Sequence, residues 1–539
     1  MLSGLLLLLL MGLWGQASAT PDAFTSKIFS EGQLSLSSSE KQGMRYFHAG
    51  RLISMRSKAE DILQERPNSY VGHYLMSYSF LYTDGNLVRA LWYLRRAMKL
   101  FKQQTKLVPS ISHQVMLKTL LGLFRELGRE KELLPVLEKL VKVYKRQDLA
   151  YTRPWALMKV GRFKAAVKAA TELLKSSKNP SAALNSLCSI FFELGRRRRA
   201  LYYCKKALEE DLKSTSTVER TIHNYNVAES YLALFNYPKA EQHGLEATRH
   251  FYANIHTNPW QLMVGFYLEQ GRFNEAWNAL KKSRRWFARQ KPSMGESLFA
   301  SQQMVLAGFW LAVGKAKPAI KHLERVRDRP DRRGFTSYKK GQQVVAAMLM
   351  RRRAYLMELE QRAERAAARG FFARLWNWWT SFGIRWTISR EESRIRKFFT
   401  RKNFLKYSLT PYRAGGISIP YILPRDYIGD LVDVVGAGVI RSTLTEIRRK
   451  EGKRFPRMLS FLDALEAEAA FAQSNTDSAR SYGRRALKNL PKQMLSLRNR
   501  MQALLGAMAF DDGKYGQMKR NFSEVLRQDG SVLRKMHMT

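Results

Sequence analysis

The chain contains very little cysteine: Cys188 and Cys204 are the two among 539 residues. So low a count excludes a disulfide-rich fold. Histidine is also scarce, and the nearest group of histidines, His243, His250 and His256, lacks closely spaced cysteine or carboxylate partners. Because metal sites need such ligands at short, regular spacing, we expect no metal site.

Motifs that carry enzyme chemistry are missing as well. No Gly-x-Ser-x-Gly elbow, phosphate-binding loop or His-Glu-x-x-His helix occurs. Gly436-x-Gly438 follows an apolar run, as in a dinucleotide-binding turn, but Arg441 stands where that motif needs its third glycine. A helix break or an apolar connector is the better interpretation. We predict that the chain is not an enzyme and has no catalytic residue and no cofactor; an enzymatic site in the connector 409–440 is the weakest alternative.

Acidic residues are few relative to basic ones. The chain has 45 Asp and Glu against 92 Lys and Arg, a formal net charge of +47. A field of this sign attracts nucleic acid, phospholipid headgroups, acidic glycans or acidic proteins. The charge alone does not choose among these partners.

Long apolar runs are also lacking. The stretch Leu5–Leu13 is too short to span a bilayer and resembles the core of a signal peptide. Ala17-Ser18-Ala19 supplies a small-x-small cleavage signature before Thr20, although residues 1–4 contain no Lys or Arg. We expect export to the periplasm or cell envelope of a bacterium, with a retained anchor as the alternative. Export makes nucleic acid a poor candidate for the partner.

What the chain does contain is a recurring spacing. A small residue, usually Gly, is followed five, nine and twelve positions later by small or apolar residues. The clearest copy is Gly195/Ala200/Cys204/Ala207. The other copies begin at Gly50, Gly85, Gly128, Gly161, Phe235, Gly271, Gly314, Ser474 and Gly513. Offsets of five, nine and twelve lie near one stripe of an α-helix, and the leading glycine ends the preceding helix. The pattern predicts tandem helical hairpins.

These repeats resemble the tetratricopeptide repeat (TPR) family. The copies at Gly195 and Gly271 match that family's pattern best, whereas Met55, Leu133 and Met518 depart from it where alanine is usual. The resemblance implies an all-α, right-handed superhelical solenoid of TPR-like hairpins with a concave face for a protein or peptide ligand. The predicted divisions are a signal peptide (1–19), a linker (20–38), a repeat array (39–345), a basic, aromatic-rich insertion with a connector (346–455) and C-terminal repeats (456–539).

Cys188 and Cys204 fall on the facing sides of one predicted hairpin. A disulfide is conceivable in an oxidising compartment. The favoured interpretation is that both are unpaired, buried, small apolar residues, because Cα atoms of neighbouring helices often lie too far apart for a bridge.

The insertion opens with a long basic helix predicted over 342–369. After it, Phe372, Leu375, Trp376, Trp379, Phe382 and Trp386 would share one helical stripe. Residues 351–407 hold 15 basic and 5 acidic side chains, a local net charge of +10. Such a stripe most often packs into the protein's own core, and this is the favoured outcome. The alternatives are insertion into a membrane interface and contact with a partner protein.

The candidate residues for membrane or partner binding all lie in this insertion. They are Phe371, Phe372, Arg374, Trp376, Trp378, Trp379, Arg385, Trp386, Lys397, Arg401 and Lys402. We expect an exported scaffold that mediates protein–protein interactions and is held at an anionic membrane surface by these residues. The alternative function is binding of an anionic polymer, such as lipopolysaccharide, acidic glycan or nucleic acid, through the basic surface.

Overall fold

We describe the chain from a computed structural model. The structure describes residues 36–82, 87–103, 110–126, 129–146, 149–176, 180–213, 217–249, 258–290, 296–326, 342–398, 428–451 and 457–536. The predicted signal peptide (1–19) and the Pro- and Gly-rich connector (409–424) lie outside these residues.

Every regular element in the described ranges is a helix. The array consists of α3 (Ser38–His48), α4 (Leu52–Glu65), α5 (Tyr70–Tyr82), α6 (Leu87–Gln103), α7 (Ser110–Glu126), α8 (Glu130–Lys142), α9 (Thr152–Lys159), α10 (Phe163–Ser176), α11 (Ser181–Glu193), α12 (Arg197–Leu212), α13 (Thr217–Ala233), α14 (Tyr237–Arg249), α15 (Pro259–Glu269), α16 (Phe273–Gln290), α17 (Glu296–Ala312) and α18 (Ala316–Leu323). Consecutive helices pair as hairpins, and each hairpin packs on the next. The predicted all-α solenoid of TPR-like hairpins is confirmed.

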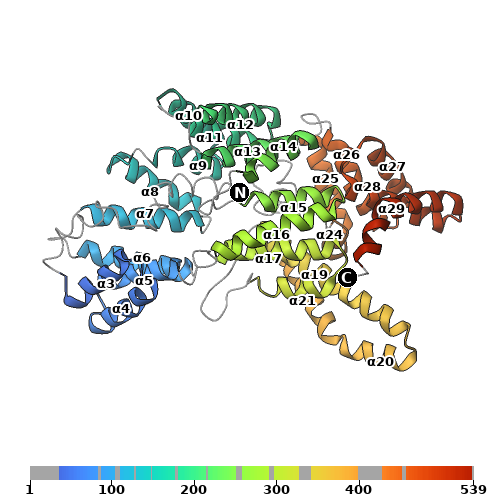
Figure 1. Ribbon diagram of the computed structural model, residues 1–539, viewed down its shortest axis with the longest axis horizontal. Coiled ribbons are helices and arrows are strands. Elements are labelled where there is room, and N and C mark those ends of the chain that lie inside the picture. Colours follow the sequence, from blue (N-terminus) through green and yellow to red (C-terminus); the bar gives the residue numbers. More distant parts are fainter. Residues whose placement is uncertain are drawn as a thin grey trace.

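The remaining helices form the insertion and the C-terminal repeats. They are α19 (Gln342–Ala367), α20 (Phe371–Thr380), α21 (Phe382–Phe398), α24 (Ile428–Val435), α25 (Ala437–Glu451), α26 (Arg457–Phe471), α27 (Thr476–Asn489), α28 (Leu495–Asp511) and α29 (Tyr515–Met536). Figure 1 shows the chain curving from α3–α6 past α9–α12 to α15–α17 and on to α25–α29. The C-terminal repeats come back toward the middle of the array, where α28 contacts α15.

The turns inside the hairpins follow the predicted frame. Six of the leading glycines have positive φ, from +65° at Gly50 to +82° at Gly161. In the two copies that lack the glycine, Phe235 (φ +56°) and Ser474 (φ +58°) adopt the same left-handed conformation. Bulky residues rarely adopt it, so at Phe235 the packing of the hairpin overrides local preference.

The stripe at offsets five, nine and twelve lies in the hydrophobic core. Ala200, Cys204 and Ala207 are at most 1% exposed, and the corresponding residues of most other copies are equally buried. Small residues at these sites let neighbouring helices approach closely: a Cβ on Gly244 would lie 2.6 Å from Met263 Sδ. The periodic small residues therefore define the packed face of each array helix.

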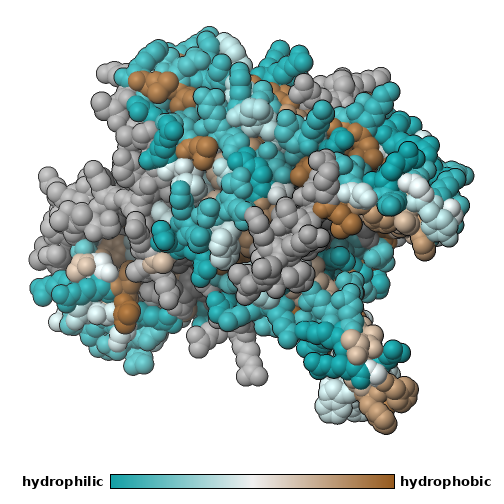
Figure 2. Space-filling view, turned by 45° about the vertical axis from the view of Figure 1, so that its right-hand side comes forward, coloured by the Kyte–Doolittle hydropathy of each residue, from teal (hydrophilic) through white to brown (hydrophobic). Residues whose placement is uncertain are grey.

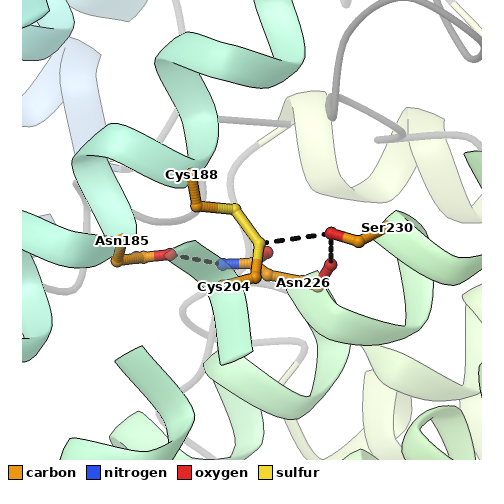
Figure 3. Close-up of a disulfide and its surroundings, with 5 residues drawn as sticks. All are labelled: Asn185, Cys188, Cys204, Asn226 and Ser230. Atoms are coloured by element: carbon orange, nitrogen blue, oxygen red, sulfur yellow. Dashed lines mark hydrogen bonds between the residues drawn. A yellow bond between two sulfur atoms is a disulfide. The ribbon is translucent and has the colours of Figure 1, made fainter. Parts of the chain in front are cut away.

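The favoured prediction for the two cysteines is wrong. Cys188 of α11 and Cys204 of α12 form a disulfide, with Cα atoms 5.1 Å apart. The small residues of this hairpin bring its helices close enough for a bridge. Figure 3 shows Ser230 of the next repeat, whose hydroxyl donates to Cys204 Sγ at 3.2 Å, and Asn226, which donates to Asn185 Oδ1 at 2.8 Å. Polar contacts thus tie the bridged hairpin to its neighbour.

Gly436 has φ +95° and separates α24 from α25. The predicted helix break at this glycine is therefore confirmed. Among the described helices, none has the length and apolar character needed to cross a bilayer. The described residues also contain no cluster of three or more metal-ligating side chains.

Candidate functional site

Helices α19, α20 and α21 build a hairpin that projects from the array, with α20 near its end (Figure 1). Helix α19 packs along α21, and α20 packs against the far part of α19. Gly370 makes the reversal at φ +93°, a conformation that glycine adopts without strain. The backbone runs from α20 into α21 with little interruption, because Arg385 N donates to Ser381 O across the junction at 3.0 Å.

The side of α20 and α21 that carries no aromatic residue faces α19. Ser381 is fully buried, Ile388 is 8% exposed, and Ala373, Asn377 and Ile384 are half-buried along the same stripe. Ser381 Oγ donates to Asn377 Oδ1 at 3.3 Å. The small side chains allow close helix contact, as in the array, so the aromatic side is left facing outward.

No residue of α20 is buried. The large apolar side chains of the tip are Phe371 (72% exposed), Phe372 (82%), Leu375 (54%), Trp376 (70%), Trp378 (57%), Trp379 (71%), Phe382 (74%) and Trp386 (58%). Figure 2 shows the projecting end as a patch of apolar and intermediate colour below a mostly hydrophilic body. The favoured prediction, that this stripe packs into the protein's own core, is wrong.

Arginines surround this aromatic tip. Between Glu364 and Glu391 the sequence contains Arg365, Arg369, Arg374, Arg385 and Arg390, and no acidic residue. The guanidinium carbon of Arg385 lies 5.9 Å from the ring centre of Trp378, and that of Arg390 lies 4.8 Å from Trp386. These cation–π contacts hold positive charge beside the apolar rings.

The base of the hairpin is fixed by buried ion pairs. Arg351 of α19 is 7% exposed and donates to Glu391 of α21 at 3.3 Å. The same guanidinium reaches the carbonyl oxygens of Leu323 and Val326, at 3.3 and 3.4 Å. Glu391 also accepts from Arg394 at 2.6 Å. Arg351 therefore joins both legs of the hairpin to the last repeat of the array.

Arg352 extends this network to the C-terminal half. Its guanidinium contacts Glu392 at 2.9 Å, Asp433 at 3.5 Å, and Asp430. Burial raises the pKa of Asp430 above its ordinary value, although Arg353 and Arg352 act in the opposite direction. Because breaking a buried pair strands a charge, these contacts restrict how the hairpin can tilt.

The predicted site residues are largely brought together. Phe371, Phe372, Arg374, Trp376, Trp378, Trp379, Arg385 and Trp386 lie at the tip. Lys397 is exposed in the last turn of α21, toward the base, and Arg401 and Lys402 lie outside the described residues.

Sequence reasoning missed the arginines Arg365, Arg369 and Arg390, which the acid-free stretch from 365 to 390 could have revealed. It also missed the roles of Arg351 and Arg352. Nothing in the sequence distinguishes these buried arginines from the exposed ones around them.

No protein-family model matches the chain, and no curated protein matches it. Solved structures with a similar helical fold include a Rap protein complexed with competence and sporulation factor (12% identity, TM-score 0.40, covering 74% of this chain and 100% of that one). A tetratricopeptide repeat protein from Parabacteroides merdae shows 16% identity and a TM-score of 0.27, over 48% of this chain and 91% of that one. The APC/C hetero-tetramer Cut9-Hcn1 shows 10% identity and a TM-score of 0.39, over 94% of this chain and 90% of that one. These likenesses concern the fold alone.

Proposed function

We propose that this chain is a helical-repeat scaffold of the cell envelope that is held at a membrane surface by the α19–α21 hairpin. The array would bind a protein or peptide on its concave face. The observation that carries the membrane part is the outward-facing aromatic side of α20, on a hairpin that projects from the array.

The physical argument rests on what the exposed rings gain. Transfer of a large apolar side chain out of water stabilises by about 1.5–3 kcal/mol, so several rings entering the acyl boundary together give a large total. Tryptophan suits this boundary because its ring is apolar while its N–H reaches water or headgroups. The projection lets the tip reach a flat surface before the array does.

Co-flotation of the full chain with phosphatidylcholine/phosphatidylglycerol vesicles tests this proposal. The triple variant Trp376→Ser/Trp379→Ser/Trp386→Ser should lower binding by more than about 100-fold. The matched control is Trp92→Ser, because Trp92 is 59% exposed on the array and lies outside the hairpin. If the triple variant bound the vesicles as tightly as the wild-type protein does, the proposed membrane function would be wrong.

A second candidate function is the binding of an anionic polymer along the array. The observation that favours it is the net charge of +47, of which residues 351–407 hold +10, so most of the excess lies elsewhere. This function predicts salt-dependent binding that survives deletion of 351–407. If the deletion abolished polymer binding, the hairpin and not the array would be the binding site.

Export is proposed because Leu5–Leu13 and Ala17-Ser18-Ala19 resemble a signal peptide, and it is compatible with the Cys188–Cys204 disulfide. N-terminal sequencing of the mature protein tests it directly: a chain that begins at Thr20 supports cleavage after residue 19. Purification from membrane and soluble fractions would then identify the protein bound to the array.

A further inference from the structure

We infer that the hairpin selects anionic phospholipid, and that the arginines around its tip form the site for the lipid phosphates. This inference rests on the proposed membrane function and names the ligand class. The residues are Arg374 and Arg385, which are exposed, and Arg390, which is half-buried. We call these three side chains the arginine collar.

Two members of the collar are held next to rings of the tip. Arg385 lies over Trp378 and Arg390 over Trp386, at 5.9 and 4.8 Å. The third, Arg374, donates to Ala367 O at 3.5 Å, a contact that leaves most of its N–H groups available. When the tryptophan rings lie at the membrane interface, guanidinium groups beside them lie at the depth of the headgroup phosphates.

Two acidic side chains of the hairpin are buried and paired with arginines. Glu391 is fully buried and pairs with Arg351 and Arg394. Arg390 of the collar lies 4.0 Å from the same carboxylate. Glu358 is 2% exposed and paired with Arg362 at 2.7 Å. The exposed Glu360 and Glu364 lie in the second half of α19. The segment from Arg365 to Arg390 contains no acidic residue, so it brings net positive charge next to the aromatic rings.

The chemistry of the tip favours a lipid surface over a soluble anion or a nucleic acid. A guanidinium binds phosphate oxygens in a two-pronged fashion, whether the phosphate belongs to a lipid or to a polymer. The three most exposed rings of the tip are those of Phe371, Phe372 and Phe382, which have no hydrogen-bonding group. Hydrocarbon next to the phosphate removes these rings from water, and a bilayer supplies both together.

The test compares two vesicle compositions, pure phosphatidylcholine and a mixture with phosphatidylglycerol. The variant Arg374→Gln/Arg385→Gln/Arg390→Gln should bind the mixed vesicles about 100-fold more weakly than wild type, and pure phosphatidylcholine equally well. The matched control, Arg196→Gln/Arg198→Gln/Lys205→Gln, removes the same charge from exposed positions of the array repeat around α12. It should lower binding to mixed vesicles much less than the collar variant.

Each result decides one question. An equal loss in both variants would overturn the inference, because whole-chain charge would then explain the selectivity. The inference would also fail if a single-stranded oligonucleotide bound wild type and lost that binding in the collar variant as strongly as mixed vesicles did. If wild type binds both vesicle types equally, lipid selection fails while membrane docking stands. If it binds neither, the proposed membrane function itself fails.

Discussion

Helix α16 of the array and helix α20 of the hairpin both carry a strong apolar stripe, but the two stripes have opposite environments. In α16, Trp277 packs against Phe309 and Trp310, with ring centres 5.2 and 5.7 Å apart. In α20, Trp376 and Trp379 are at least 70% exposed. The difference lies in the small residues: in α16 they share a side with the large ones, whereas in α20 they lie on the opposite side. In both helices, the side that carries the small residues is the side that packs against a neighbouring helix.

The largest expected effect comes from matched phenylalanine truncations. Phe309→Ala, at a fully buried position, should lower the free energy of unfolding by about 4 kcal/mol, because it leaves a cavity in the array. Phe372→Ala, at 82% exposure, should change it by less than about 0.5 kcal/mol. Chemical denaturation of both variants measures the difference. Similar destabilisation in the two would mean that the α20 rings are packed in solution.

The next comparison breaks the base of the hairpin instead of its tip. Arg352→Leu leaves Asp430 and Glu392 without their buried partner, and should cost about 3 kcal/mol. Hydrogen exchange should show faster opening of α19, α21 and α24, with little change in α5 or α11. Vesicle binding should persist, since the tip is intact. Unchanged protection in α21 would contradict the anchoring role given to Arg352.

The smallest expected effect is a difference in pH dependence between the stability of the array and vesicle binding by the hairpin. Burial, with Arg325, Arg284 and Lys321 nearby, lowers the pKa of His322 from 6.5 to about 4 in the folded array. The folded state therefore disfavours the proton, and the stability due to neutral His322 is complete above pH 6.5 and lost as the pH falls toward 4. The pKa values of His48, His73 and His243 shift the same way.

Melting temperatures at pH 7.5 and pH 5 should show a drop that is reduced in His322→Asn. Residues 342–398 contain no histidine, and arginine stays charged throughout this range. Binding to mixed vesicles should therefore vary little between these two pH values while the protein remains folded. A wild-type melting temperature that does not fall at pH 5 would contradict the assignment of a neutral His322.

Much of the array was predictable because the signal is local and repeated. Offsets of five, nine and twelve identified Ala200, Cys204 and Ala207 as core residues, and the leading glycines identified the turns. The candidate tip residues were found from composition and helical spacing. Their exposure was not, because an apolar stripe has the same periodicity whether it faces a neighbouring helix or solvent.

Contacts between residues far apart in the sequence could not be predicted from the spacing of the repeats. Arg352 meets Asp430 across 78 residues, and nothing near either residue in the sequence marks the pair. Cys188 and Cys204 lie only 16 residues apart, yet their pairing depended on how closely one pair of helices packs. The distance between two helix axes depends on all the side chains of their interface together, so no single residue predicts it.

By itself the sequence determined the helices, the places where they turn and the face that each array helix buries, since these depend on residues within a turn or two of one another. Only the tertiary structure decided that α20 would pack its small-residue side against α19, so that its aromatic side faces outward. It also decided that Arg351 and Arg352 would hold the base of the hairpin through ion pairs. The reason is physical: side-chain burial depends on which surface arrives opposite it, and that surface comes from distant parts of the chain.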